Sequence, residues 1–170
     1  MRTVYLIGAR ASGKTSLGRE LARTLGRPFA DTDHLFVQLR GVSIADYVAE
    51  QGWEAFRDAE TEALRAAADP PGAVAACGGG IVLRPANRDI LATGLVLYLH
   101  APAEVLARRL GADPLEAQRP SLTGEGIADE VHRVLAQREG LYRDCADAVL
   151  DATAPPQEVL QSALDVLDAL

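Results

Sequence analysis

The segment that most constrains this chain is Gly8–Thr15, which reads Gly-Ala-Arg-Ala-Ser-Gly-Lys-Thr. It fits the pattern G-x-x-x-x-G-K-[ST] in full, and it lies between an apolar run at residues 3–7 and a segment whose leucines recur every fourth residue. Strand, glycine-rich loop and helix in this order are the setting of a phosphate-binding loop. The backbone N–H groups of such a loop surround phosphate oxygens, and the helix N-terminus adds partial positive charge. The segment therefore predicts a nucleotide-binding protein, the alternative being a chance match in a glycine-containing turn.

Two side chains of this loop have predictable tasks. Lys14 is the only lysine in the chain, and it supplies a compact charge for the β- and γ-phosphates where arginine would supply a planar fork. The Thr15 hydroxyl is expected to ligate Mg²⁺. We expect the nucleotide to contact the whole run of Gly8, Ala9, Arg10, Ala11, Ser12, Gly13, Lys14, Thr15 and Ser16.

Composition narrows the class of protein further. A chain of 170 residues is expected to form one domain, and no apolar run approaches the roughly 20 residues that a membrane span needs. The net charge of −7 argues against a general nucleic-acid surface. Cys77 and Cys145 show no C-x-x-C spacing, and the three histidines are isolated, so we expect reduced thiols and no zinc site. We expect a cytoplasmic monomer that binds neither membrane nor nucleic acid.

Short apolar runs alternate with amphipathic segments along the chain, which predicts an α/β fold: a three-layer, doubly wound sheet of five parallel strands with flanking helices. The expected strands are 3–7, 28–30, 73–76, 95–99 and 148–150. The expected helices are 16–25, a region from 44 that is broken at Gly52, then 87–92, 103–110, 127–144 and 157–170. Ligands of such sheets bind beyond the carboxyl ends of the strands, where Gly8, Asp31, Asp33 and Gly78–Gly80 fall.

Two carboxylates follow the second expected strand. No Asp follows the third or fourth strand, so Asp31 is the best candidate for a Mg²⁺ ligand. Asp33 would point the same way as Asp31 if the backbone is extended there. One carboxylate can then serve the metal while the other accepts a proton from an acceptor hydroxyl. Helix N-capping is the alternative for either residue.

Other candidates have competing interpretations. Arg57 and Glu60 share a helix face, either as an exposed ion pair or as an arginine held by Glu60 to bind a carboxylate. The run Gly78, Gly79 and Gly80 indicates close approach of the backbone to a ligand rather than a simple turn. Residues 111–126 are rich in Gly, Pro and Asp and predict a mobile loop. There Arg119 would place a cation over the phosphates, or would be a solvated loop residue. Arg138, in the helix expected at 127–144, is either a functional residue or an ordinary surface charge.

Together these segments resemble shikimate kinase across essentially the whole chain. The matching segments are the phosphate-binding loop, Asp31-Thr32-Asp33, residues 52–57 with Glu60, residues 78–82, Asn87-Arg88, residues 96–99, Arg119-Pro120, and Arg138 with Leu141-Tyr142. The resemblance implies a nucleoside-monophosphate-kinase-like P-loop fold, with a substrate-binding subdomain near 32–60 and a lid near 112–126. It implies phosphorylation of the shikimate 3-hydroxyl by ATP, with Mg²⁺ as the cofactor, in aromatic amino-acid biosynthesis.

The resemblance also implies roles for individual residues. Asp33 would bind shikimate hydroxyls and act as the base. Arg57 and Arg138 would hold the carboxylate, Glu60 would orient Arg57, and the Gly79 N–H would contact the substrate alongside Gly78 and Gly80. On the nucleotide side, Thr15 and Asp31 would serve Mg²⁺, while Lys14, Arg119 and Arg10 would stabilise the transferring phosphoryl group. Arg109 would stack on adenine with Pro156 as a second wall, although the adjacent Arg108 leaves that assignment open.

Some features depart from the family pattern. The lid is longer than in the commoner form of the family, which looks like one of two isoenzyme lineages. Cys77 stands where Thr or Ser is usual, and we expect it only to pack. The nearest alternative is a P-loop kinase of another small polyol acid such as gluconate. The second alternative is a GTPase-like switch. Residues 69–72 fit its D-x-x-G motif, but they precede a strand rather than follow one, and the chain contains no N-K-x-D motif to bind guanine.

Overall fold

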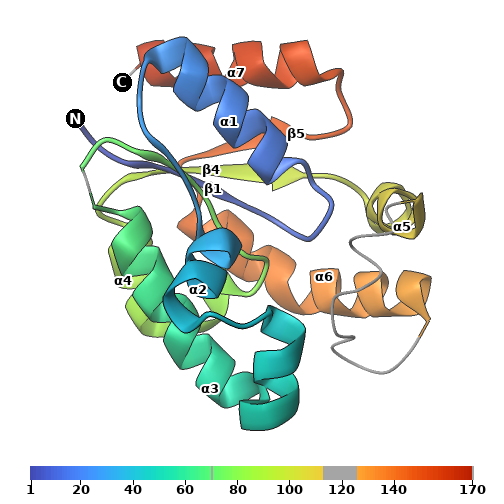
Figure 1. Ribbon diagram of the computed structural model, residues 1–170. Helices are drawn as coiled ribbons and strands as arrows, with labels where there is room; N and C mark the ends of the chain where they lie inside the picture. Colours follow the sequence, from blue (N-terminus) through green and yellow to red (C-terminus); the bar gives the residue numbers. More distant parts are fainter. Residues whose placement is uncertain (70, 113–125, 170) are drawn as a thin grey trace.

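The computed structural model describes residues 1–69, 71–112 and 126–169 (Figure 1). The order of elements is β1 (Val4–Ile7), α1 (Lys14–Leu25), β2 (Phe29–Asp31), α2 (Thr32–Arg40), α3 (Ile44–Ala67), β3 (Val74–Ala76), the 3-10 helix η1 (Ile81–Leu83), α4 (Pro85–Leu91), β4 (Leu95–His100), α5 (Ala103–Ala112), α6 (Ile127–Cys145), β5 (Ala148–Asp151) and α7 (Pro156–Asp168). In this described part, no helix is both long and apolar enough to cross a bilayer.

The five strands form one parallel sheet in the order β2-β3-β1-β4-β5. β1 lies at the centre, and all four of its residues are buried because helices cover both faces. The edge strands β2 and β5 are more exposed. All carboxyl ends of a parallel sheet meet at one edge, so the segments that follow β1, β2 and β3 are brought together there. The predicted doubly wound sheet is confirmed.

Helices complete the outer layers. α1 and α7 lie together on one face of the sheet, and α3, α4 and α6 lie on the other (Figure 1). The main core joins the strands to the buried faces of these helices, with large side chains such as Tyr5, Leu21 and Leu97 entirely buried. The apolar residues that repeat at helical spacing are thus the ones that fill the space between sheet and helices.

α2 and the start of α3 have an apolar cluster of their own. Phe36 meets Tyr47 and Phe56 edge to face, with ring centroids 5.2 and 5.1 Å apart, and Trp53 meets Phe56 in the same way at 5.7 Å. The chain turns sharply at Gly52, whose φ of 82° suits glycine. This turn, which the sequence predicts as a break, directs Trp53 and the following residues toward the carboxyl edge of the sheet.

Some expected boundaries need correction. The sequence leaves residues 32–40 without a helix, yet α2 begins directly after β2 because Asp31 caps it. Asp33 is therefore in the first turn of a helix, and the extended backbone assumed for it is wrong. The short helix expected at 87–92 begins earlier, at Pro85, a residue whose fixed φ suits a first turn. The other ends shift by one or two residues, within the usual fraying of termini.

Candidate active site

The loop between β1 and α1 surrounds a hollow of about 320 Å³ at the carboxyl edge of the sheet. Lys14 Nζ donates to the Ala9 carbonyl at 2.7 Å and to Ser12 Oγ at 3.4 Å, so the ammonium group is held across the loop. Gly8 has a φ of 143°, and a Cβ there would lie 2.6 Å from the Leu99 carbonyl oxygen, so only glycine fits. The loop thus brings two cationic side chains, Arg10 and Lys14, to the lining of the same hollow.

Thr15 and Asp31 meet at the rim of this hollow. Thr15 Oγ1 donates to Asp31 Oδ2 at 2.8 Å, while Asp31 Oδ1 accepts from the N–H groups of Asp33 and His34 at 3.0 and 3.2 Å. Asp31 is therefore the helix cap that the sequence offers as the alternative, and its other oxygen still reaches the phosphate-binding loop. A hydroxyl and a carboxylate are oxygen ligands of the kind that Mg²⁺ prefers.

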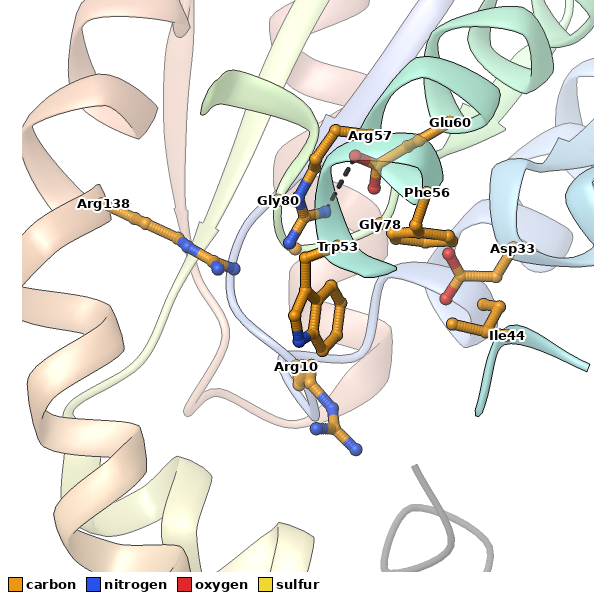
Figure 2. Close-up of a pocket in the computed structure, with 11 residues that line it drawn as sticks. Arg10, Asp33, Ile44, Trp53, Phe56, Arg57, Glu60, Gly78, Gly80 and Arg138 are labelled. Carbon is orange, nitrogen blue, oxygen red and sulfur yellow. Dashed lines mark hydrogen bonds and ion pairs between the residues drawn. The ribbon is translucent and has the colours of Figure 1, made fainter. Parts of the chain in front are cut away.

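A second pocket lies beside the first and is lined by charged side chains from three helices and from the phosphate-binding loop. Figure 2 shows Asp33 from α2, Arg57 from α3 and Arg138 from α6 pointing into it. Its lining consists of Arg10, Asp33, Ile44, Trp53, Phe56, Arg57, Glu60, Gly78, Gly79, Gly80 and Arg138.

Arg57 and Glu60 form a buried ion pair in this pocket. Arg57 Nη1 lies 2.9 Å from Glu60 Oε2, and the two residues are only 8% and 3% exposed. Burial raises the pKa of the Glu60 carboxyl, and the Arg57 guanidinium opposes that rise. Arg57 also lies 5.3 Å from the ring centres of Trp53 and Phe56. The interpretation as an exposed ion pair is wrong, and a fixed, desolvated cation faces the pocket instead.

The three glycines after β3 run between these charged groups. A Cβ on Gly78 would lie 2.8 Å from Glu60 Oε1 and 2.9 Å from Asp33 Oδ1. A Cβ on Gly80 would lie 2.1 Å from Arg57 Nη1. At these two glycines an added Cβ would displace a charged side chain of the pocket, a cause that the sequence does not reveal.

Arg138 approaches the pocket from the opposite side and is 7% exposed. Burial lowers the pKa of its guanidinium from the usual value, and electrostatic attraction to the neighbouring Tyr142 opposes that fall. Tyr142 is itself completely buried, and its hydroxyl donates to the Gly79 carbonyl. The sequence singles out Tyr142 only as part of a matching segment. Its position one helical turn after Arg138 is the signal that could have identified it.

The two hollows share a wall. Arg10, Asp33, Gly78 and Gly79 line both of them. A group bound at the phosphate-binding loop and a group bound beside Arg57 therefore face each other across Asp33. This arrangement suits the transfer of a group between two ligands, since it holds both reactants close and oriented.

The remaining candidates lie around the nucleotide hollow. Arg109 lines it and is held by the carbonyls of Ala152 at 2.7 Å and Ala11 at 3.4 Å, whereas Arg108 is exposed. Pro156 is exposed at the start of α7. Cys77 is buried, and burial raises the pKa of its thiol, which leaves it protonated. Arg119 and residues 113–125 of the lid expected at 112–126 lie outside the described residues.

Comparisons with known proteins agree with this geometry. A sequence model of the family described as shikimate kinase matches residues 10–168. "Shikimate kinase 2" of Syntrophotalea carbinolica is 52% identical over 98% of this chain and 96% of that protein, and its namesake in Dickeya chrysanthemi is 51% identical over 92% and 91%. The structure of shikimate kinase from Acinetobacter baumannii in complex with shikimate superposes with a TM-score of 0.92 at 30% identity, covering 99% and 94% of the two chains. This chain belongs to the shikimate kinase family.

Proposed function

We propose that this protein transfers the γ-phosphoryl group of ATP to the 3-hydroxyl of shikimate, giving shikimate 3-phosphate and ADP. The single observation that carries the proposal is the shared wall: Asp33 lines both the phosphate-binding hollow and the pocket that contains the buried Arg57. A planar carboxylate suits a guanidinium, and the hydroxyls of a cyclic triol suit a carboxylate acceptor. A small polyhydroxy acid therefore matches both ends of this pocket.

On the acceptor side, Asp33 takes the proton of the attacking hydroxyl as the new oxygen–phosphorus bond forms. Arg57 and Arg138 hold the substrate carboxylate, and Glu60 keeps Arg57 in place through the 2.9 Å contact. The backbone of Gly78–Gly80 borders the acid.

On the nucleotide side, the bond between the γ-phosphorus and the bridging oxygen breaks, and the leaving charge stays on ADP. Lys14, Arg10 and Arg119 stabilise the transferring group. Arg109, which is held against Ala152, stacks on the adenine with Pro156 nearby. Thr15 and Asp31 would hold Mg²⁺, which supplies positive charge to the phosphates and fixes their orientation.

We also propose a cytoplasmic monomer with a substrate-binding subdomain at 32–60 and a lid at 112–126. These follow from the sequence and the family, and size-exclusion chromatography with light scattering tests the monomer directly.

The function is tested by initial rates of ADP release from Mg-ATP with shikimate, gluconate, nucleoside monophosphates or no acceptor. We expect strong stimulation by shikimate alone and a preference for ATP over GTP. ADP release stimulated by gluconate but not by shikimate would support ATP binding at the phosphate-binding loop and would refute shikimate as the acceptor.

A further inference from the structure

A buried tyrosine links the acid-binding side of the pocket to its glycine wall. Tyr142 follows Arg138 by one turn of α6, and its side chain is completely buried. Its hydroxyl donates a hydrogen bond to the Gly79 carbonyl, and the Arg138 guanidinium lies close enough to interact with the same hydroxyl. One hydroxyl therefore connects a helix to the segment that follows β3.

The chemistry of the groups fixes how the hydroxyl can serve both neighbours. A carbonyl only accepts, so the hydroxyl donates to Gly79, and its oxygen is left to face the Arg138 guanidinium, which only donates. Burial raises the pKa of Tyr142 to about 12, with the Arg138 charge opposing the rise, and the hydroxyl keeps its proton at neutral pH. In a site shielded from water, such linked hydrogen bonds strengthen one another.

The Gly79 carbonyl has a different partner from the carbonyls on either side of it. The carbonyls of Gly78 and Gly80 accept from the N–H groups of Ile81 and Leu83 at 3.1 and 3.0 Å, within the same turn. The carbonyl between them is bound by Tyr142 instead. Gly79 has no side chain to anchor it, and even an added Cβ would make only ordinary contacts, the nearest at 3.6 Å.

The tyrosine ring packs against the sheet. It stacks on Tyr98 of β4 with ring centroids 5.1 Å apart and an interplanar angle of 26°. The ring that carries the hydroxyl is thus supported by β4 as well as by its own helix.

We propose that Tyr142 is a positioning residue for shikimate, whose hydroxyl holds Arg138 and the Gly79 peptide in the arrangement that binds the substrate carboxylate. This inference rests on the proposed function, because the acid must be bound in this pocket for the link to matter. Tyr142 does not touch the reacting atoms, so its loss weakens acid binding more than it slows phosphoryl transfer.

The test is the variant Tyr142→Phe, which keeps the stacked ring and removes only the hydroxyl. We expect the KM and the Kd for shikimate to rise about 10-fold or more, as for loss of a hydrogen bond to a charged group. We expect the KM for ATP to stay within about twofold and kcat to fall by less than the KM for shikimate rises. Tyr98→Phe is the matched control, because it removes a buried hydroxyl from the neighbouring ring and leaves that of Tyr142 in place. A loss of stability alone would affect both variants, and it would not change the KM for shikimate selectively over the KM for ATP.

A double-mutant cycle with Arg138→Ala tests whether the effect passes through Arg138. We expect the double variant to lose less shikimate affinity than the sum of the two single losses. Strict additivity, or a shikimate KM for Tyr142→Phe equal to that of Tyr98→Phe, would overturn the inference. A parent protein that does not phosphorylate shikimate would instead refute the proposed function, so the two failures are distinct.

If Tyr142→Phe does not accumulate as folded protein, the link can be measured with the tyrosine hydroxyl intact. Protein labelled with ¹³C at the ring carbon that bears the hydroxyl is compared with the same protein carrying Arg138→Ala. We expect a buried tyrosine signal to shift, and a spectrum in which no tyrosine signal responds would overturn the inference.

Discussion

The variant Gly80→Ala tests the position of Arg57 with the addition of one methyl group. Gly80 has φ and ψ angles of −91° and 3°, which alanine can adopt, so the substitution does not strain the backbone. The new Cβ would lie 2.1 Å from Arg57 Nη1, 2.4 Å from Cζ and 2.6 Å from Nη2. These atoms are the far end of a flexible side chain, and the guanidinium is therefore what must move.

The size of the effect follows from that displacement. Non-bonded carbon and nitrogen atoms lie about 3.5 Å apart at contact, so the guanidinium must shift by more than about 1 Å. The 2.9 Å contact with Glu60 does not survive such a shift in its present form. Removing one partner of a buried, hydrogen-bonded charge pair costs about 2–5 kcal/mol in binding. A displaced arginine retains part of its attraction for the acid, so we expect about 2 kcal/mol, or about a 30-fold rise in the KM for shikimate.

Steady-state kinetics with each substrate varied in turn is the assay. Gly140→Ala is the matched control, because a Cβ added at this exposed position of α6 would meet no neighbouring atom within 4 Å. This control should leave both KM values unchanged and add about 0.5–1 kcal/mol of stability, as alanine does in place of glycine in a helix. A shikimate KM for Gly80→Ala equal to that of the control would refute the placement of Arg57 beside the acid.

Three further changes separate the roles of the other residues. Asp33→Asn should lower kcat by orders of magnitude while calorimetry still detects ATP binding, and unchanged turnover would remove Asp33 as the base. Arg138→Ala should weaken shikimate binding by about 2–5 kcal/mol, and a shikimate KM close to that of the parent protein would exclude it from the acid site. Thr15→Ala should raise the Mg²⁺ concentration needed for half-maximal rate, and an unchanged Mg²⁺ titration would argue against a ligand at this position.

The sheet and the loop between β1 and α1 could be predicted from the sequence because their signals are local. The phosphate-binding loop is one uninterrupted motif, and the continuous apolar runs at β1 and β4 are typical of central parallel strands. The strand order was not predicted, because it depends on which helices cross which face rather than on any single segment.

The pocket that contains Arg57, Glu60 and Arg138 is harder to predict from the sequence, because it is formed by packing between distant segments. Arg57 and Glu60 are three residues apart whether they are exposed or buried, and only the packing of α3 against the Gly78–Gly80 segment decides which. The helix after Asp31 was missed because a short polar segment has little periodicity, although its cap was among the alternatives. Tyr142 contacts Gly79 across 63 positions in the sequence, a contact that no local pattern indicates.

In the proposed reaction, an acid held by Arg57 and Arg138 presents one hydroxyl to ATP across Asp33. The most direct test of this claim is the identity of the product formed from Mg-ATP and shikimate, determined by ³¹P–¹H correlation NMR. We expect one phosphate ester, on the oxygen of carbon 3, formed in equal amount with ADP. A phosphate on another hydroxyl, or ADP released without any phosphorylated shikimate, would contradict the orientation that these residues impose.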